Sequence, residues 1–338
     1  MRARRTTLLA ALAVTSSLAL AAPAHAATAP QHNGQAKHCS LPVGESTVTV
    51  HSGGLPRTAL VYRPADTGAA TALPLHLSLH GSSSRASEQL VVSGLEDSAD
   101  RQHFLAVAPQ GVMQSGAGYQ WNVPGVTGDG GPDDEQFLTD LLDTLGATGC
   151  ADIGQVLASG YSGGGRMVSQ YACDHPGRVT AIAPVAGLRA GFPVDDDGVT
   201  VPDPGTCTPS RSVPVITFHG TADPVNPYDG GGQPYWGYGT DTALAAWARV
   251  DHCTQGPATT SVSEHVTKIA YGACRGGADV ALYRVAGGGH TWPGSDLDFG
   301  PLGPVTQEID ATELAWQFFE THRHNRADRP TAPAAATR

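Results

Sequence analysis

The sequence lacks a long hydrophobic run beyond its first residues, an excess of positive charge, and any pair of cysteines separated by two residues. The first absence excludes a membrane-spanning helix in the rest of the chain, because such a helix needs about 20 apolar residues. The second argues against nucleic acid and anionic membranes as partners, since the formal net charge is −11. The third removes the usual spacing of zinc ligands. We therefore expect neither a metal ion nor a cofactor.

The first 26 residues have the layout of a cleavable secretory signal. Three arginines, at positions 2, 4 and 5, precede an apolar run from Leu8 to Ala22, and the segment ends in Ala24-His25-Ala26. The run is too short and too rich in alanine for a membrane anchor. We expect a secreted, extracellular protein whose net charge changes from −11 to −14 on cleavage, because the segment has no acids. The general secretory and twin-arginine routes both stay open.

Six cysteines form an even set in a chain that is expected to reach an oxidising compartment, so we expect three disulfides. Spacing alone does not determine which cysteines pair. Our working assignment pairs Cys39 with Cys207, Cys150 with Cys173, and Cys253 with Cys274.

Short runs of valine, isoleucine and leucine alternate with longer segments of helical period, which is typical of a mostly parallel sheet with flanking helices. We predict a single α/β domain over residues 44–324, preceded by an arm at 27–43 and followed by a flexible tail at 325–338. Eight strands are expected, at Thr47–His51, Ala59–Tyr62, Leu75–Leu79, Leu105–Ala108, Val156–Ser159, Ala181–Val185, Val215–Phe218 and Ala281–Val285. Five helices are expected, at Glu88–Arg101, Asp134–Leu145, Gly163–Cys173, Asp241–Val250 and Ala311–His322.

Ser162 is the candidate nucleophile. It lies in Gly160-Tyr161-Ser162-Gly163-Gly164, between an apolar run and a segment that can be helical. A nucleophile elbow, the tight strand-turn-helix that presents a catalytic serine, needs small residues two before and two after the serine. The chain has 42 glycines, so chance could produce the match alone, but the flanking strand and helix favour the elbow over an ordinary turn serine.

A serine hydroxyl is a weak nucleophile and needs a histidine base that is oriented by a carboxylate. In proteins with such an elbow, the acid and then the histidine follow the serine along the chain. Asp223 lies in a loop directly after the strand at 215–218, and we predict it to be the acid, with Asp229 and Asp241 as alternatives. His290 follows three glycines after the last strand, and we predict it to be the base.

Two backbone amides are expected to bind the oxyanion that forms when the serine attacks a carbonyl. Gly163 starts the helix after the serine, where amides lack partners within the helix. The second amide should come from the loop after the third strand, where Ser82 is preferred and Ser83 is the alternative. His80 and His219 are expected to brace their loops and not to take part in catalysis.

With these residues placed, the chain resembles the secreted polyhydroxybutyrate depolymerase and feruloyl esterase group of the α/β-hydrolases, which is related to carbohydrate esterase family one. The resemblance extends from about Gly44 to Phe319. It rests on Leu79-His80-Gly81, Ala108-Pro109-Gln110-Gly111, Trp121-Asn122, Asp133-Asp134, the motif at Ser162, His219-Gly220-Thr221-Ala222-Asp223, and Gly289-His290-Thr291-Trp292-Pro293-Gly294.

The resemblance implies an α/β-hydrolase fold and hydrolysis of a carboxylic ester through an acyl-enzyme. It also implies that Trp121, Asn122 and Trp292 lie near the substrate, although packing of the tryptophans in the core is an equal alternative. The chain lacks the separate polymer-binding domain and linker of the extracellular polymer depolymerases. This difference argues against crystalline polyester as the substrate.

The ester itself is not determined by the sequence. Feruloyl or other aryl esters and short hydroxyalkanoate esters are favoured, on a plant cell-wall polysaccharide or a polyester, while acetyl-xylan and simple aliphatic esters stay open. Glycine-rich stretches at 114–131 and 229–239 are expected to shape the pocket. An acyltransferase with the same triad, a non-catalytic polymer-binding relative and a serine peptidase are the competing functions. Nothing in the sequence determines the oligomeric state.

Overall fold

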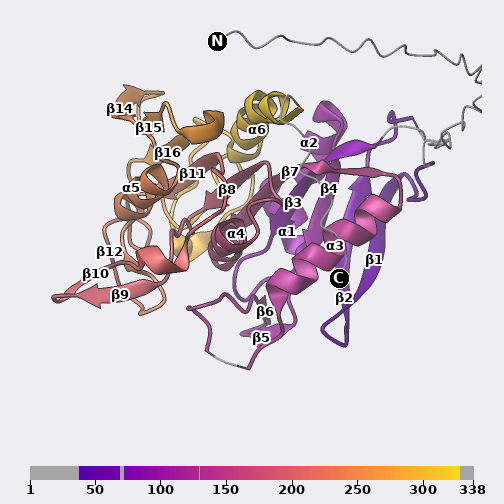
Figure 1. The fold of residues 1–338 in the computed structure, drawn as a ribbon, viewed down its shortest axis with the longest axis horizontal. Helices are drawn as coiled ribbons and strands as arrows, with labels where there is room; N and C mark the ends of the chain where they lie inside the picture. Colours follow the sequence, from indigo (N-terminus) through magenta and orange to yellow (C-terminus); the bar gives the residue numbers. More distant parts are fainter. Residues whose placement is uncertain (1–37, 69–71, 129, 328–338) are drawn as a thin grey trace, which may run out of the picture. The chain divides into compact units, whose positions relative to one another are not determined.

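The structure is a computed structural model that describes residues 38–68, 72–128 and 130–327. The predicted signal at 1–26, most of the arm and the end of the tail lie outside the described residues. Ten strands form one sheet in the order β1-β2-β4-β3-β7-β8-β11-β16-β15-β14 (Figure 1). Its parallel centre is made of β3 (Leu73–Leu79), β4 (Leu105–Pro109), β7 (Ala151–Tyr161), β8 (Ala181–Val185), β11 (Val215–Gly220) and β16 (Val280–Val285).

Antiparallel strands complete the sheet at both edges. They are β1 (Gly44–Ser52) and β2 (Leu55–Arg63) at one edge, and β14 (Gln255–Ser261) and β15 (Val266–Gly272) at the other. All eight predicted strands are confirmed, but the predicted number of eight is wrong. The two additional strands are β14 and β15. All of β14 is exposed and only the first residue of β15 is buried, so neither has the alternation of buried apolar and exposed polar residues that could reveal it.

Two layers of helices cover the two faces of the sheet and bury separate apolar clusters. The helices α3 (Asp134–Ala147), α4 (Gly163–Asp174) and α5 (Thr240–Val250) share one cluster. The helices α1 (Ala86–Ser93), α2 (Leu95–Gln102) and α6 (Ala311–Ala327) share the other. Strand β7 contributes to both, because Val156 and Ala158 join the first cluster while Leu157 joins the second. The α/β-hydrolase fold class is thus confirmed.

The segment predicted as one helix, Glu88–Arg101, is two helices. Gly94 separates them with φ 56° and ψ 34°, a left-handed conformation that an L-residue rarely adopts. Its N–H bonds to the carbonyls of Leu90 and Val91, which ends α1 and turns the chain into α2. The last helix is longer than predicted, because α6 extends to Ala327.

Short strands form three separate two-stranded pairs within the long connections. They are β5 (Met113–Ser115) with β6 (Gly118–Gln120), β9 (Pro193–Asp196) with β10 (Val199–Pro202), and β12 (Gly230–Gly231) with β13 (Gly237–Tyr238). The first and last pairs lie in the two glycine-rich stretches, so these stretches have structure of their own. In the part of the chain that the structure describes, no helix combines the length and the apolar character needed to cross a membrane.

The disulfides correct two of the three predicted pairs. Cys253 pairs with Cys274 as predicted, but Cys39 pairs with Cys150 and Cys173 with Cys207. The arm runs beside the start of β7, where the Ser40 amide donates to the Thr148 carbonyl, and this contact brings the first pair together. Cys173 lies in the last turn of α4, next to the segment at 206–207, and Gln170 of the same helix donates to the Thr206 carbonyl. The predicted pairs Cys39–Cys207 and Cys150–Cys173 are therefore wrong.

Candidate active site

Ser162 lies at the turn between β7 and α4, as predicted. Its φ of 52° and ψ of −112° are a strained combination for a residue with a Cβ, and its amide donates to the Val185 carbonyl at 2.8 Å. A Cβ on Gly160 would lie 2.4 Å from the Gly164 carbonyl carbon, and a Cβ on Gly164 would lie 2.3 Å from the Leu79 carbonyl oxygen. The two glycines are therefore required by the close approach of backbone segments in this turn.

Alanine at position 164 is expected to lower the free energy of unfolding by about 1–3 kcal/mol, because its methyl group would overlap the β3 backbone. Urea denaturation monitored by tryptophan fluorescence measures the change. Gly177→Ala is the matched control, since its Cβ would meet nothing within 4 Å. Equal midpoints for the two variants would contradict the assignment of a sterically closed elbow.

Asp223 and His290 lie together, each in the loop that follows its strand. His290 Nδ1 donates to Asp223 Oδ2 at 2.7 Å, and both side chains are buried. The other carboxylate oxygen, Oδ1, accepts from the amides of Val225 and Asn226 at 2.8 Å each. These bonds fix the carboxylate and hence the imidazole ring.

His219 also contacts this carboxylate. Its Nε2 lies 3.2 Å from Asp223 Oδ2 and 2.8 Å from the Asn226 carbonyl oxygen. The sequence predicts His219 to be a loop-bracing residue, and these contacts agree with that role. Burial raises the pKa of Asp223, but the hydrogen bonds from His219 and His290 outweigh burial and hold the pKa below its ordinary value.

The pKa of His290 is lowered below its ordinary value of 6.5. Burial is the largest cause, and electrostatic interactions with His219 and Arg166 add to it, whereas the hydrogen bond and charge of Asp223 oppose it. The imidazole is therefore neutral at pH 7, the state in which its free nitrogen can accept a proton from a serine.

Activity on a neutral ester is expected to rise with pH through a pKa below 6.5 and then to level off. The protonated form of His290 cannot act as a base, and its pKa is lowered. Asp223 stays ionised across this range because its pKa is also lowered. The pH profile of kcat/KM measures the midpoint, and a midpoint above 6.5 would contradict the lowered pKa.

The predicted nucleophile and the predicted base line the same cavity, which has a volume of about 410 Å³. Ser162, His290, Gly163 and Ser82 all line it. A Cβ on Gly163 would lie 3.2 Å from the Ser82 amide nitrogen, so the two predicted oxyanion amides are neighbours. Ser83, the alternative donor, also lines the cavity.

The remaining walls come largely from the two glycine-rich stretches. Residues of the first stretch are Ser115, Gln120, Trp121, Val123, Val126 and Thr127, and Tyr235 comes from the second. Of the three residues predicted to contact substrate, Trp121 lines the cavity and its Nε1 donates to the His80 carbonyl. Asn122 and Trp292 do not line it, and bond instead to Pro132 and Thr312. Their positions do not support substrate contact.

His80 is buried behind this wall, as predicted for a bracing residue. Its Nδ1 bonds to the Gly81 carbonyl, and its Nε2 accepts from the Gly111 amide. Burial lowers the pKa of His80 to about 4, so the ring is neutral. It therefore links the loop of Ser82 to the start of the first glycine-rich stretch.

Two residues of the site were not found from the sequence. Tyr161 precedes the serine, and its hydroxyl donates to the His290 carbonyl at 2.5 Å, which joins the nucleophile strand to the histidine loop. Arg166 follows the serine by four residues, on the same face of the helix, and lines the cavity. The spacing of Arg166 from Ser162 was the signal that could have revealed it.

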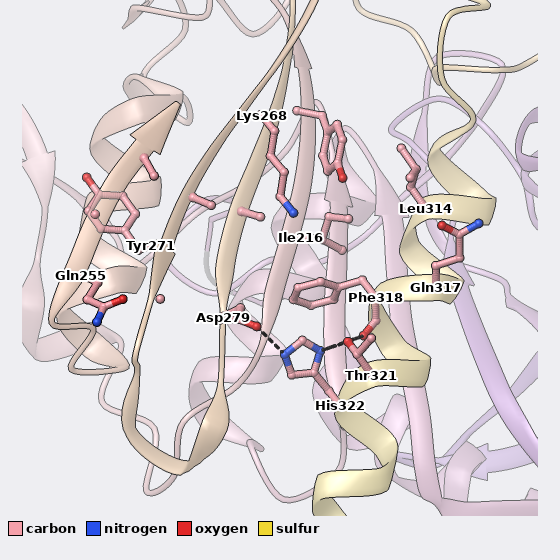
Figure 2. A pocket seen from close by; sticks show the side chains of 16 residues that line it. Ile216, Gln255, Lys268, Tyr271, Asp279, Leu314, Gln317, Phe318, Thr321 and His322 are labelled. Atoms are coloured by element: carbon pink, nitrogen blue, oxygen red, sulfur yellow. Dashed lines mark hydrogen bonds and ion pairs between the residues drawn. The ribbon is translucent and has the colours of Figure 1, made fainter. Parts of the chain in front are cut away.

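A larger cavity of about 610 Å³ lies between the β14–β16 edge and α6 (Figure 2). It shares no residue with the cavity at Ser162. His322 pairs there with Asp279 at 3.3 Å and with the Phe318 carbonyl, as the dashed lines in Figure 2 show. Its described lining residues include no serine, so they do not repeat the arrangement of the site at Ser162.

No family model matches the chain. Feruloyl esterase B of Piromyces equi is 29% identical over 69% of this chain, and the match spans 42% of that protein, less than half of its length. NocK of Nocardia uniformis subsp. tsuyamanensis, provisionally described as an esterase, is 27% identical over 82% of this chain and 84% of its own length. The structure of acetyl xylan esterase from Aspergillus awamori matches with a TM-score of 0.54 and 15% identity, over 73% of this chain and 94% of that one. The chain thus has the α/β-hydrolase fold, and over 69% of its length its sequence is similar to part of a feruloyl esterase.

Proposed function

We propose that this chain hydrolyses carboxylic esters through Ser162, His290 and Asp223. The observation that carries the proposal is the bonded pair of His290 and Asp223, which faces the same cavity as a serine held in a strained elbow. Esterases among the relatives support it.

In the proposed reaction, His290 takes the proton from the Ser162 hydroxyl as its oxygen attacks the ester carbonyl. The amides of Ser82 and Gly163 hold the negative oxygen of the tetrahedral intermediate. His290 then gives the proton to the leaving alcohol, and the acyl group remains on Ser162. A water activated by the same histidine releases the acid and restores the serine.

The cavity supports an acyl group with an aromatic or short aliphatic body. Trp121, Val123, Val126 and Leu302 give its wall an apolar part that can contact such a body, and the polar side chains beside them can orient the ester. We therefore propose feruloyl or other aryl esters, or short hydroxyalkanoate esters, as substrates. Three disulfides fit export to an oxidising compartment, and we propose that the enzyme acts outside the cell.

Labelling with a fluorophosphonate, followed by peptide mass spectrometry, tests the nucleophile. We expect the adduct on Ser162, and an adduct on another serine would overturn the assignment. A panel of methyl ferulate, acetylated xylan, polyhydroxybutyrate film and p-nitrophenyl esters of increasing chain length then identifies the acyl group. Transfer of the acyl group to an added alcohol in preference to water would instead indicate an acyltransferase.

A further inference from the structure

Arg166 is a buried cation directly beside the proposed reaction centre. It lies in the first turn of α4, its side chain lines the cavity of Ser162, and only 6% of the residue is exposed. Its Nη2 would lie 3.5 Å from a Cβ at position 163, the residue whose amide faces the oxyanion. Burial lowers the pKa of Arg166 to about 10, so the group is still charged at neutral pH.

No acidic partner neutralises this charge among the residues that the structure describes. Nε and Nη1 of Arg166 have no hydrogen-bond partner, and no carboxylate lies within ion-pair distance. Its guanidinium carbon lies 4.6 Å above the Tyr235 ring, and this contact fixes the plane of the group. No acidic side chain lines the cavity either. In a chain with a net charge of −11, this is a local excess of positive charge.

A second arginine positions the first without neutralising it. Arg189 donates from Nη2 to the Tyr235 carbonyl at 3.0 Å and from Nη1 to the Tyr238 carbonyl at 3.3 Å. These bonds hold the second glycine-rich stretch, and with it the Tyr235 ring, against Arg166. The two guanidinium groups also repel each other, which contributes to the lowered pKa of Arg166.

The position of Arg166 at the start of α4 adds to the local excess of positive charge. The first turn of α4 contains no acidic residue, and a helix N-terminus carries partial positive charge from its free amides. An arginine there is unfavourable in the free protein. An uncompensated charge that is this buried also destabilises the fold, unless an anion completes its hydrogen bonds.

We propose that Arg166 binds a carboxylate of the substrate, so that the preferred esters carry a negative charge close to the scissile bond. Half-esters of dicarboxylic acids, and hydroxy acids that are acylated on the hydroxyl and keep a free carboxylate, have this chemistry. The proposal rests on the proposed ester hydrolysis and specifies its substrate class. A carboxylate accepts hydrogen bonds from a guanidinium more strongly than a neutral oxygen does.

The test compares pairs of esters of equal shape. Monoethyl succinate against ethyl 4-methylpentanoate places the carboxylate in the acyl part, and butyryloxyacetate against isobutyl butyrate places it in the alcohol part. In both pairs an isopropyl group replaces the carboxylate. We expect the wild-type protein to favour the charged ester in one pair, measured as kcat/KM in a pH-stat. No preference in either pair would overturn the proposal without any variant.

Arg166→Met is then expected to lower the charged-to-neutral ratio of kcat/KM by about 10- to 100-fold, the usual effect of one hydrogen bond to a charged group. Arg166→Lys should recover part of the ratio. Arg178→Met is the matched control, because it removes one positive charge at a surface pair with Asp143 and should leave the ratio unchanged. Equal losses on both members of each pair would show that Arg166 acts on the oxyanion or on the fold, and would overturn the proposal.

Direct binding separates this proposal from the proposed hydrolysis. Calorimetry of monoethyl succinate and of butyryloxyacetate with Ser162→Ala is expected to detect binding of one of them, weakened about 10-fold or more by adding Arg166→Met. Binding that persists in the double variant would contradict the arginine site. If Ser162→Ala instead still hydrolysed either ester, the proposed mechanism would fail, while the dependence of binding on Arg166 would still judge the carboxylate site.

Discussion

Ser162→Ala is expected to lower kcat for a p-nitrophenyl ester by about 10⁵- to 10⁶-fold, the loss found when a triad nucleophile is removed. The variant keeps the amides of Ser82 and Gly163, so a residual rate above that in water should remain. Stability should change little, because Ser162 has a strained φ that alanine would share and its hydroxyl makes no bond to the protein scaffold among the described residues. Initial rates with purified protein, checked by circular dichroism, measure both effects.

Ser115→Ala is the matched control for this result. Ser115 lines the same cavity, and among the residues that the structure describes its hydroxyl bonds only to the Ser83 hydroxyl, at 3.0 Å. Its loss should alter kcat by less than about tenfold, since surface hydroxyl pairs contribute about 1 kcal/mol. If Ser115→Ala and Ser162→Ala lost activity to the same extent, Ser162 would not be the nucleophile.

Asp223→Asn is expected to lower kcat by about 10⁴-fold, the effect of presenting the wrong histidine tautomer in a triad. Asparagine can still accept from the amides of Val225 and Asn226 through its oxygen. Its NH₂ group would then face His290 Nδ1, which could only accept, so the proton would move to the nitrogen that has to act as the base. The variant would also lose the hydrogen bond from His290 that lowers the pKa of Asp223 in the wild-type protein.

Asp241→Asn provides the comparison, because the sequence alone leaves Asp241 open as an alternative acid. In the structure its Oδ1 accepts from the Tyr228 hydroxyl at 2.6 Å, and it makes no contact with His290 among the described residues. We expect its kcat to stay within about tenfold of wild type. Steady-state kinetics at pH 8 measures both variants, and a larger loss in Asp241→Asn than in Asp223→Asn would reverse the assignment of the acid.

The sequence predicts the central sheet, and the loops that carry the proposed triad, because both depend on local patterns. Buried parallel strands are continuous apolar runs. The elbow requires glycine at positions 160 and 164, because a Cβ at either position would overlap backbone atoms. Each residue of the triad also follows a strand, so strand positions alone bring the loops of Ser162, Asp223 and His290 to one edge of the sheet.

The features that the sequence does not reveal depend on contacts between distant segments. The pairing of Cys39 with Cys150 follows from the path of the arm beside β7, which no local pattern specifies. The spacing of Arg166 from Ser162 indicates only that the two share a face of the helix; that no acid accompanies Arg166 in the cavity is shown by the structure. Trp292 belongs to a conspicuous motif, but its position is determined by packing near Tyr161 and by its bond to Thr312.

The three disulfides each join a cysteine to the next one along the chain, across 111, 34 and 21 residues, so their loops neither overlap nor enclose one another. A chain that enters an oxidising compartment with its N-terminus first therefore presents its thiols in matching pairs. When Cys150 emerges, Cys39 is the only other free thiol, so the two pair correctly. Once that disulfide has closed, Cys207 meets only Cys173 as a free thiol, and after them Cys274 meets only Cys253. Oxidation in the order of emergence yields the native connectivity directly, and no bond has to be exchanged afterwards.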